Sequence, residues 1–293
     1  TRNPALLRLA RHCKWSLFDR TKSAELLGWP LLTECLGPRS GLFYLLVGLG
    51  IVPRLREHHR SMGIPENITR DTCRQVRCYC ETYQKGHEGN PGIQLKRISL
   101  LRPYVREPYV RIGRLEYWLK PNPVPPYVYQ NIRSGQTLAL AWPDPPVAQE
   151  GYMVRGESKG GYWHSTFTED GSGVTGQPIS PSGKVMHKTV TLAPQEWKRA
   201  LGPGDEVLQI HIPSGEPVKP ELIRASKNEA VAFFKQYFPA TSPKAFVCTS
   251  WTFSDLLESM LPESSNLVQW LRELYLFPLP SPAHSGLSFI FPE

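Results

Sequence analysis

The sequence has few cysteines and no long apolar run, and each shortage excludes a class of protein. Six irregularly spaced cysteines in 293 residues exclude a small domain held by disulfides and favour free thiols in a reducing compartment. The longest apolar run, Gly41–Pro53, is shorter than the roughly 20 residues that a membrane span requires. We therefore expect a buried core helix there, no membrane partner and a cytoplasmic location.

The sequence also lacks runs of like charge. Lys and Arg number 34 against 26 Asp and Glu, so the net charge is +8, which favours anionic partners such as phosphorylated cofactors. Because no basic run alternates with stacking aromatics, we expect no nucleic-acid partner. The chain begins without Met, shows no leader pattern and ends in an expected strand, so we leave open whether its termini are complete.

Three cysteines lie close together, at Cys73, Cys78 and Cys80. They lack the C-x-x-C spacing that places two thiolates on one zinc ion. Apolar residues around them recur at helical spacing, which puts Cys73 and Cys80 on one side of a helix and Cys78 on another. We expect half-buried structural residues and no metal site.

The predicted secondary structure changes along the chain from helical to extended. Residues from Pro4 to about Gly86 have the apolar spacing of three or four helices, whereas Tyr109–Leu119 is rich in β-branched and aromatic residues. Seven prolines between Pro121 and Pro146 indicate a stiff connector around one short strand, Gln136–Trp142. We place a domain boundary at its end, dividing the chain into residues 1–147 and 148–293.

The second half predicts a largely antiparallel sheet with flanking helices. The expected strands are Gly161–Phe167, Val185–Leu192, Glu206–Ile212, Ala245–Thr249 and Gly286–Phe291. The expected helices are Pro194–Leu201, Pro220–Tyr237 and a stretch from Ser254 to Tyr275 that is broken near Pro262. Because a long helix separates the strands Glu206–Ile212 and Ala245–Thr249, we expect these two strands to be parallel neighbours.

Three runs of residues carry a resemblance to a known family: RIGRLEY (Arg111–Tyr117), DEVLQIHIPSGEP (Asp205–Pro217) and KAFVCTSWTFSDLLESMLPESSNLVQW (Lys244–Trp270). The chain resembles the bacterial acyltransferase-domain family, which joins an N-acyltransferase N-terminal domain to a GNAT-like C-terminal domain. The resemblance implies an α+β fold in which a helical N-terminal domain precedes a GNAT-like mixed sheet. It also implies transfer of an acyl group from acyl-coenzyme A, as co-substrate rather than tightly bound cofactor. The resemblance does not supply the acceptor, which we expect to be an unidentified small-molecule or peptide amine.

The loop after the strand Glu206–Ile212 departs from GNAT enzymes at large. Their glycine-rich loop holds the coenzyme A pyrophosphate with backbone N–H groups. Here the run Ile212–Pro217 has one glycine, two prolines that lack an N–H, and an acidic residue. Ile212, Ser214 and Gly215 are our candidates for donor binding, and the loop also leaves room for a non-catalytic binding protein.

His211 is our candidate for the catalytic base. It lies at the end of the expected central strand, and an imidazole has an ordinary pKa near 6.5, which suits proton transfer at neutral pH. Ser250 and Trp251 follow the neighbouring strand, where they would either bind substrate or simply cap a helix and the core. Cys248 lies inside an apolar strand, where a reactive thiolate is disfavoured.

Three further residues are weaker candidates. Asn266 would cap a helix or lie near the acyl donor, and Arg111 and Arg114 would either be solvated or line a cleft between the domains. The alternative to an enzyme is a small-molecule or peptide binding protein that has lost the pyrophosphate loop and uses Trp142, Trp163 and Trp251 as pocket walls.

Overall fold

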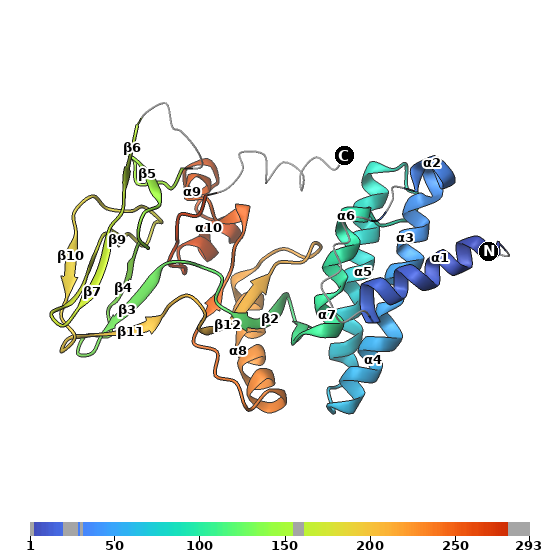
Figure 1. Ribbon diagram of the computed structural model, residues 1–293, viewed down its shortest axis with the longest axis horizontal. Coiled ribbons are helices and arrows are strands. Elements are labelled where there is room, and N and C mark those ends of the chain that lie inside the picture. Colours follow the sequence, from blue (N-terminus) through green and yellow to red (C-terminus); the bar gives the residue numbers. More distant parts are fainter. Residues whose placement is uncertain (1–2, 20–28, 30–31, 155–160, 281–293) are drawn as a thin grey trace.

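Three parts of the molecule lie side by side in the computed structural model (Figure 1): a bundle of helices, a central sheet with its own helices, and a lobe of short strands. The structure describes residues 3–19, 29, 32–154 and 161–280. The chain runs from the bundle into the central sheet, out through the lobe and back into the central sheet. The central sheet is therefore built from two distant stretches of sequence.

The described part of the bundle lies within residues 3–106. Its elements are α1 (Pro4–Lys14), η1 (Trp15–Asp19), α2 (Thr33–Leu36), η3 (Gly37–Arg39), α3 (Ser40–Gly48), α4 (Ile51–Ser61), α5 (Glu66–Gly86), α6 (Leu95–Ile98), η4 (Ser99–Leu101) and α7 (Pro103–Arg106). The Asn3 side chain caps α1 by accepting from Ala5 N at 2.9 Å. Glycine permits the close crossing of α3 and α5, because a Cβ at Gly41 would lie on the Tyr83 ring.

The apolar run near residue 45 forms α3 and the start of α4, with one face in the core. Phe43, Val47 and Ile51 are buried, whereas Leu46 on the other face is half exposed. The helical stretch Thr33–Ser61 is long and apolar enough to cross a membrane, and 44% of its most apolar window is buried inside the molecule. Core helices meet the same two criteria, and the buried face agrees with the predicted core helix.

The central sheet has the order β1-β2-β12-β13, with bounds β1 (Tyr109–Ile112), β2 (Leu115–Pro121), β12 (Glu206–His211) and β13 (Phe246–Val247). The first three strands are antiparallel, and β12 and β13 are parallel neighbours, as predicted. The crossover between them contains α8 (Pro220–Tyr237), whose bounds match the sequence prediction. Proline at its first position and Glu221 in its first turn favour that start.

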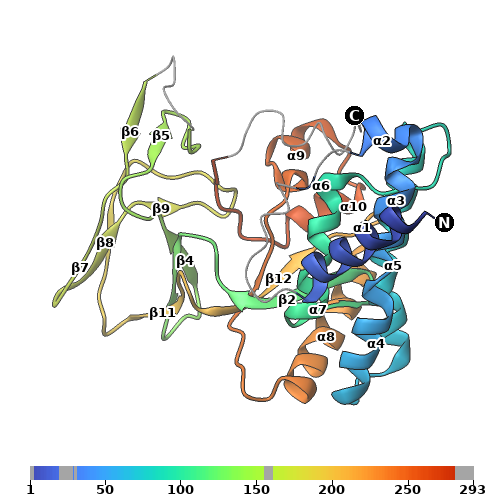
Figure 2. The same cartoon turned by 45° about the vertical axis from the view of Figure 1, so that its right-hand side comes forward.

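The two faces of the central sheet have different neighbours. One face packs against α8 through an apolar cluster that includes Tyr117, Ile210 and Phe234. The other face meets the bundle, in which α5 and α7 contact β1. Figure 2 shows the bundle next to the central sheet. The interface with the bundle is where the polar side chains of the sheet gather.

The lobe between β2 and β12 contains more strands than the sequence pattern indicates. They are β3 (Tyr127–Asn131), β4 (Thr137–Leu140), β5 (Pro146–Ala148), β6 (Tyr162–His164), β7 (Phe167–Asp170), β8 (Gly173–Gly176), β9 (Pro178–Ile179), β10 (Val190–Leu192) and β11 (Trp197–Leu201). The helix expected over Pro194–Leu201 is wrong, because β11 pairs with β3 there. Pairing with a distant strand overrides the local helical signal.

After β13 the chain forms η5 (Trp251–Phe253), α9 (Leu256–Met260) and α10 (Asn266–Leu271), so the expected break near Pro262 is present. The strand expected over Gly286–Phe291 lies outside the described residues. The division at residue 147 stays a prediction; that residue lies in β5, and strands on both sides of it pair in the central sheet. The α+β class with a mixed, largely antiparallel sheet is confirmed.

Candidate functional site

Three polar side chains form a row across the central sheet. Arg111 of β1 lies directly opposite Glu116 of β2, and Glu116 lies directly opposite His211 of β12. Residues that face each other in antiparallel strands project from the same face of the sheet. The row lies on the face that meets the bundle, since the Arg111 guanidinium contacts Cys78 Sγ of α5 at 3.8 Å.

Glu116 is the centre of this row, and none of its surface is exposed. Its Oε2 atom accepts hydrogen bonds from Tyr104 Oη at 2.7 Å, from Tyr109 Oη at 3.3 Å and from His211 Nδ1 at 2.7 Å. Its Oε1 atom is buried and has no hydrogen-bond partner in the described part of the chain. A buried carboxylate is stabilised by such donors, which replace the water it has lost.

The two tyrosines act as donors because they stay protonated. Burial raises the pKa of Tyr104 and of Tyr109 well above the usual range, and the nearby Glu116 carboxylate raises both further. The rings stack on each other with centroids 4.1 Å apart. Packing therefore fixes both hydroxyl groups beside Glu116.

His211 is the exposed member of the row, with 47% of its side chain accessible to solvent. Its Nδ1 atom contacts Glu116, so we assign the proton to Nδ1 and the free lone pair to Nε2. A carboxylate that orients an imidazole in this way is the arrangement of a general base. The predicted base is thus joined to a partner that the sequence analysis did not name.

The site lies where β12 and β13 part. Their ladder pairs Leu208 with Phe246 and Gln209 with Val247, and no further pair follows in the described residues. His211 lies just beyond the last pair on β12, and Ser250 and Trp251 follow β13. Exposed backbone at such a parting is available to pair with an extended ligand.

The loop after His211 is fastened by Arg114. The Arg114 guanidinium donates to Pro213 O at 2.9 Å and to Pro217 O at 3.4 Å. Ser214 and Gly215, two predicted donor-binding residues, are exposed between these anchors, whereas Ile212 packs toward the α8 face. Arg111 and Arg114 are both buried, which excludes the solvated alternative for them.

The remaining predicted residues have structural contacts. Ser250 caps η5 by accepting from Thr252 N at 3.3 Å, and half-exposed Trp251 begins that turn. Asn266 begins α10, which packs on α8, and no hydrogen bond within the described part of the chain joins it to His211. Burial raises the pKa of the Cys248 thiol to about 12, which agrees with its predicted inert role.

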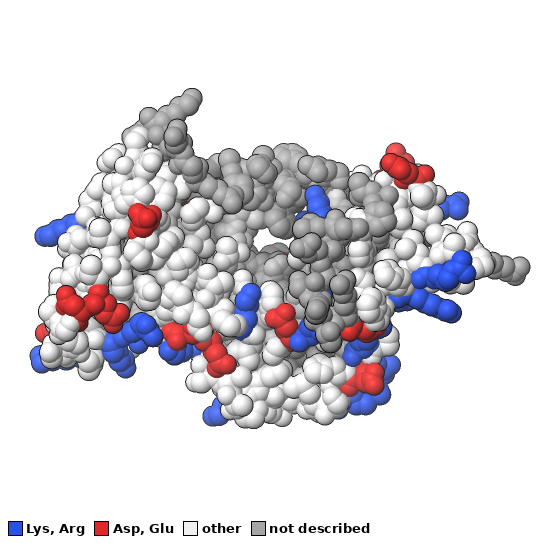
Figure 3. All heavy atoms as spheres, viewed as in Figure 1, with Lys and Arg blue, Asp and Glu red and all other residues white. Residues whose placement is uncertain are grey.

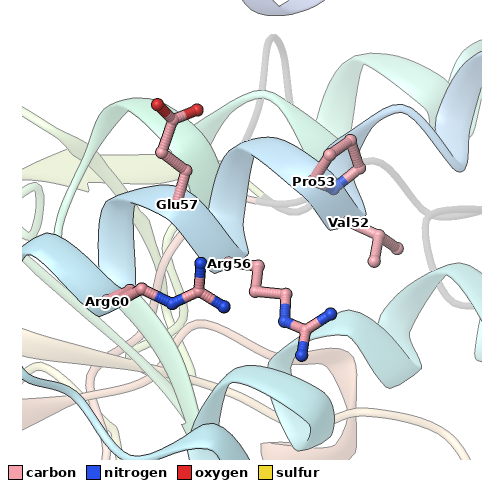
Figure 4. Close-up of a pocket in the computed structure, with 5 residues that line it drawn as sticks. All are labelled: Val52, Pro53, Arg56, Glu57 and Arg60. Carbon is pink, nitrogen blue, oxygen red and sulfur yellow. The ribbon is translucent and has the colours of Figure 1, made fainter.

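No other part of the described surface competes clearly as a site. No group of three or more metal-binding side chains occurs among the described residues. A hollow of about 470 Å³ lies on α4 and is lined by Val52, Pro53, Arg56, Glu57 and Arg60 (Figure 4), none of them a predicted site residue. Acidic and basic side chains are mixed over the face in Figure 3, so its charge does not mark a docking surface.

Comparison with known families decides the assignment. Residues 109–293 match the GNAT-like C-terminal domain, and residues 1–96 match the N-acyltransferase N-terminal domain. The chain belongs to this N-acyltransferase family. The family resemblance noted in the sequence is therefore confirmed, and no curated protein matches the chain in a separate comparison.

Solved acyltransferase structures share the fold of this family member. A mutant acyltransferase in complex with octanoyl-CoA matches with a TM-score of 0.57 and 18% identity, over 92% of this chain and 59% of the other. An acyltransferase bound to decanoyl-CoA matches with a TM-score of 0.53 and 22% identity, over 92% of this chain and 60% of the other. An acyltransferase bound to decanoyl-CoA and teicoplanin matches with a TM-score of 0.61 and 20% identity, over 100% of this chain and 68% of the other. This chain thus spans about six tenths of the first two proteins.

Glu116 is the site residue that the sequence analysis missed. It stands within the RIGRLEY run, yet alternation in the strand makes a lone Glu look like a solvent-facing residue. Its neighbours Leu115 and Tyr117 face the opposite side, so only the docking of α5 and α7 shows that Glu116 is enclosed. The apolar residues on both sides of Glu116 in β2 were the sequence signal that could have indicated its burial.

Proposed function

We propose that this protein transfers an acyl group from an acyl-coenzyme A donor to the amine of a small molecule or peptide. One observation carries the proposal: the His211–Glu116 pair lies at the parting of β12 and β13. The solved acyltransferases of the same fold bind octanoyl-CoA or decanoyl-CoA, and one also binds teicoplanin, which supports the donor and the peptide-like acceptor.

In the proposed reaction, His211 Nε2 removes the proton from the attacking amine while Glu116 holds Nδ1. The amine nitrogen forms a bond to the thioester carbonyl carbon, and the bond from that carbon to sulfur then breaks. The proton taken by His211 passes to the departing thiolate, so the products are an amide and free coenzyme A. Glu116 stabilises the imidazolium that exists between the two proton transfers.

The residues around the parting of the strands are proposed to hold the substrates. Ile212, Ser214 and Gly215 follow β12, and Ser250 and Trp251 follow β13, which supports a substrate position between the two strand ends. Asn266 stays a weaker proposal, because α10 packs with α8. The half-exposed ring of Trp251 offers a flat apolar wall for an acyl chain or an acceptor.

The experiment measures release of coenzyme A from decanoyl-CoA in the presence of a panel of amino sugars, amino acids and short peptides. We expect amine-dependent release by the wild-type chain. His211→Ala and Glu116→Gln should each lower the rate roughly 100- to 10,000-fold, the usual contribution of general base catalysis. His164→Ala, which changes an exposed histidine of β6, is the matched control and should leave the rate unchanged.

Two results would contradict the proposal. If His211→Ala remains folded and keeps full turnover, His211 is not the base. If the wild-type chain binds decanoyl-CoA but shows turnover with none of the acceptors, the non-catalytic alternative takes the place of the proposed function. The same holds if the chain binds no acyl-coenzyme A at all. Thermal unfolding separates these cases, because a bound ligand raises the midpoint whether or not it reacts.

A further inference from the structure

Arg111 and Arg114 are two buried cations without a countercharge in contact. They are only 8% and 7% exposed, and no carboxylate of the described residues lies within 4 Å of either guanidinium. The Glu216 and Glu116 carboxylates act on Arg114 only through space. A buried, unpaired charge is costly, so such a pair is expected where an anion binds.

Both side chains have N–H groups left over for a ligand. Arg111 uses Nη1 to contact Cys78 Sγ at 3.8 Å, and Arg114 uses Nε and Nη1 for the two proline carbonyls of the loop. Arg111 Nε and Nη2 and Arg114 Nη2 make no hydrogen bond within the described residues. None of these nitrogens is among the fully enclosed atoms that lack a partner, so each keeps some contact with solvent.

The two guanidinium groups are also close enough to repel each other. Burial lowers the pKa of Arg114, and the positive charge of Arg111 lowers it further. The hairpin that carries them turns at Gly113 with φ of 58°, a conformation that glycine adopts readily. An anion beside both groups would relieve this repulsion, because its charge attracts each guanidinium.

The position of the pair suggests which ligand it serves. Arg114 is bonded to the loop that follows His211, and Arg111 is in the same row as His211. This loop has prolines where an N–H is needed to hold a phosphate, so guanidinium groups of the neighbouring hairpin can supply the missing donors.

We infer that Arg111 and Arg114 form an anion site for an oxyanion carried by a substrate, either a phosphate of the donor or a carboxylate of the acceptor. The naming of donor and acceptor rests on the proposed function, whereas the anion site itself does not. Arg111 is the residue to change, because Arg114 also anchors the loop.

The test is calorimetric titration of the full chain with inorganic pyrophosphate, succinate, coenzyme A and pantetheine. Arg111→Gln should weaken pyrophosphate or succinate binding roughly ten- to hundred-fold, and Arg111→Lys should restore part of the loss. Arg133→Gln removes the same charge from an exposed turn of the lobe and should change nothing. Thermal unfolding verifies that each variant is folded.

The four ligands distinguish the two possible sources of the oxyanion, the donor phosphate and the acceptor carboxylate. If Arg111→Gln weakens coenzyme A as much as pyrophosphate but leaves pantetheine unchanged, the site binds donor phosphate. If it weakens succinate and leaves coenzyme A unchanged, the site binds an acceptor carboxylate. If neither pyrophosphate nor succinate binds the wild-type chain, or if both bind Arg111→Gln with wild-type affinity, the anion site is refuted. Pyrophosphate binding without acyl transfer would instead refute only the proposed function.

Discussion

Glu116 shows how the surroundings of one residue decide its chemistry. It has no exposed surface, yet its Oε2 atom accepts three hydrogen bonds, from Tyr104, Tyr109 and His211. A carboxylate oxygen can only accept a hydrogen bond, whereas a side-chain amide can also donate one. Because it can only accept, it orients the His211 ring with the proton on Nδ1. A glutamine at this position could donate as well and would lose that control.

A second buried group, His59, predicts how stability depends on pH. Burial lowers the pKa of His59 from 6.5 to about 4, with a smaller contribution from the charge of His58. Its Nδ1 atom contacts Thr69 Oγ1 at 2.9 Å. Between pH 4 and 6.5 the unfolded chain binds a proton that the folded chain does not, so the free energy of unfolding should fall as pH falls, by about 3 kcal/mol over this window.

Urea unfolding at several pH values from 4 to 7.5 measures this effect. His59→Gln keeps a neutral partner for Thr69 and should flatten the dependence between pH 4 and 6.5. His58→Gln, which changes the exposed neighbour, should keep most of the slope. An equal slope in wild type and His59→Gln would show that other groups control the acid sensitivity.

At the scale of elements, the crossing of α3 and α5 depends on glycine. A Cβ at Gly41 would lie 2.3 Å from Tyr83 Cζ, and one at Gly92 would lie 2.5 Å from Tyr83 Cε1. We expect Gly41→Ala to lower the free energy of unfolding by about 1–3 kcal/mol, since the ring must leave its packed position. Urea midpoints measure the loss.

Two further variants test whether the clash is the cause. Gly171→Ala, where nothing lies within 4 Å, should change stability little. Adding Tyr83→Leu to Gly41→Ala should recover part of the loss, because the shorter side chain leaves room for the methyl group. If the double variant is less stable than the sum of the single variants predicts, the close approach is not what makes glycine necessary.

Elements with strong local signals could be predicted from the sequence, and elements that depend on distant partners could not. The bounds of α8 were predicted because proline begins the helix and its apolar spacing is regular. Strand β11 was read as a helix because its pairing with β3 is not visible in the local sequence. The same reason hid Glu116: His211 was found from its place at a strand end, but the partner lies on another strand and the donors on α7 and β1.

At the scale of the whole molecule, the lobe of short strands is attached to the central sheet through two neighbouring stretches of chain. One leaves β2 at Pro121, and the other enters β12 at Glu206. Asn122 joins them: its Nδ2 donates to Gly202 O at 2.9 Å, and its backbone N–H donates to Asp205 O at 2.7 Å. The base of the lobe is therefore held by a residue that is only 5% exposed.

Asn122→Ala should loosen the lobe without disturbing the bundle. The substitution leaves the buried Gly202 carbonyl without this donor, which costs about 1–3 kcal/mol. Hydrogen exchange should become faster in residues 127–201 and stay unchanged in α5, because local opening spares parts that keep their contacts. Asn131→Ala removes a comparable amide from an exposed turn of the same lobe and should have a smaller effect. Faster exchange in α5 to the same degree would show that lobe and bundle unfold as one cooperative unit, and the junction at Asn122 would then not separate them.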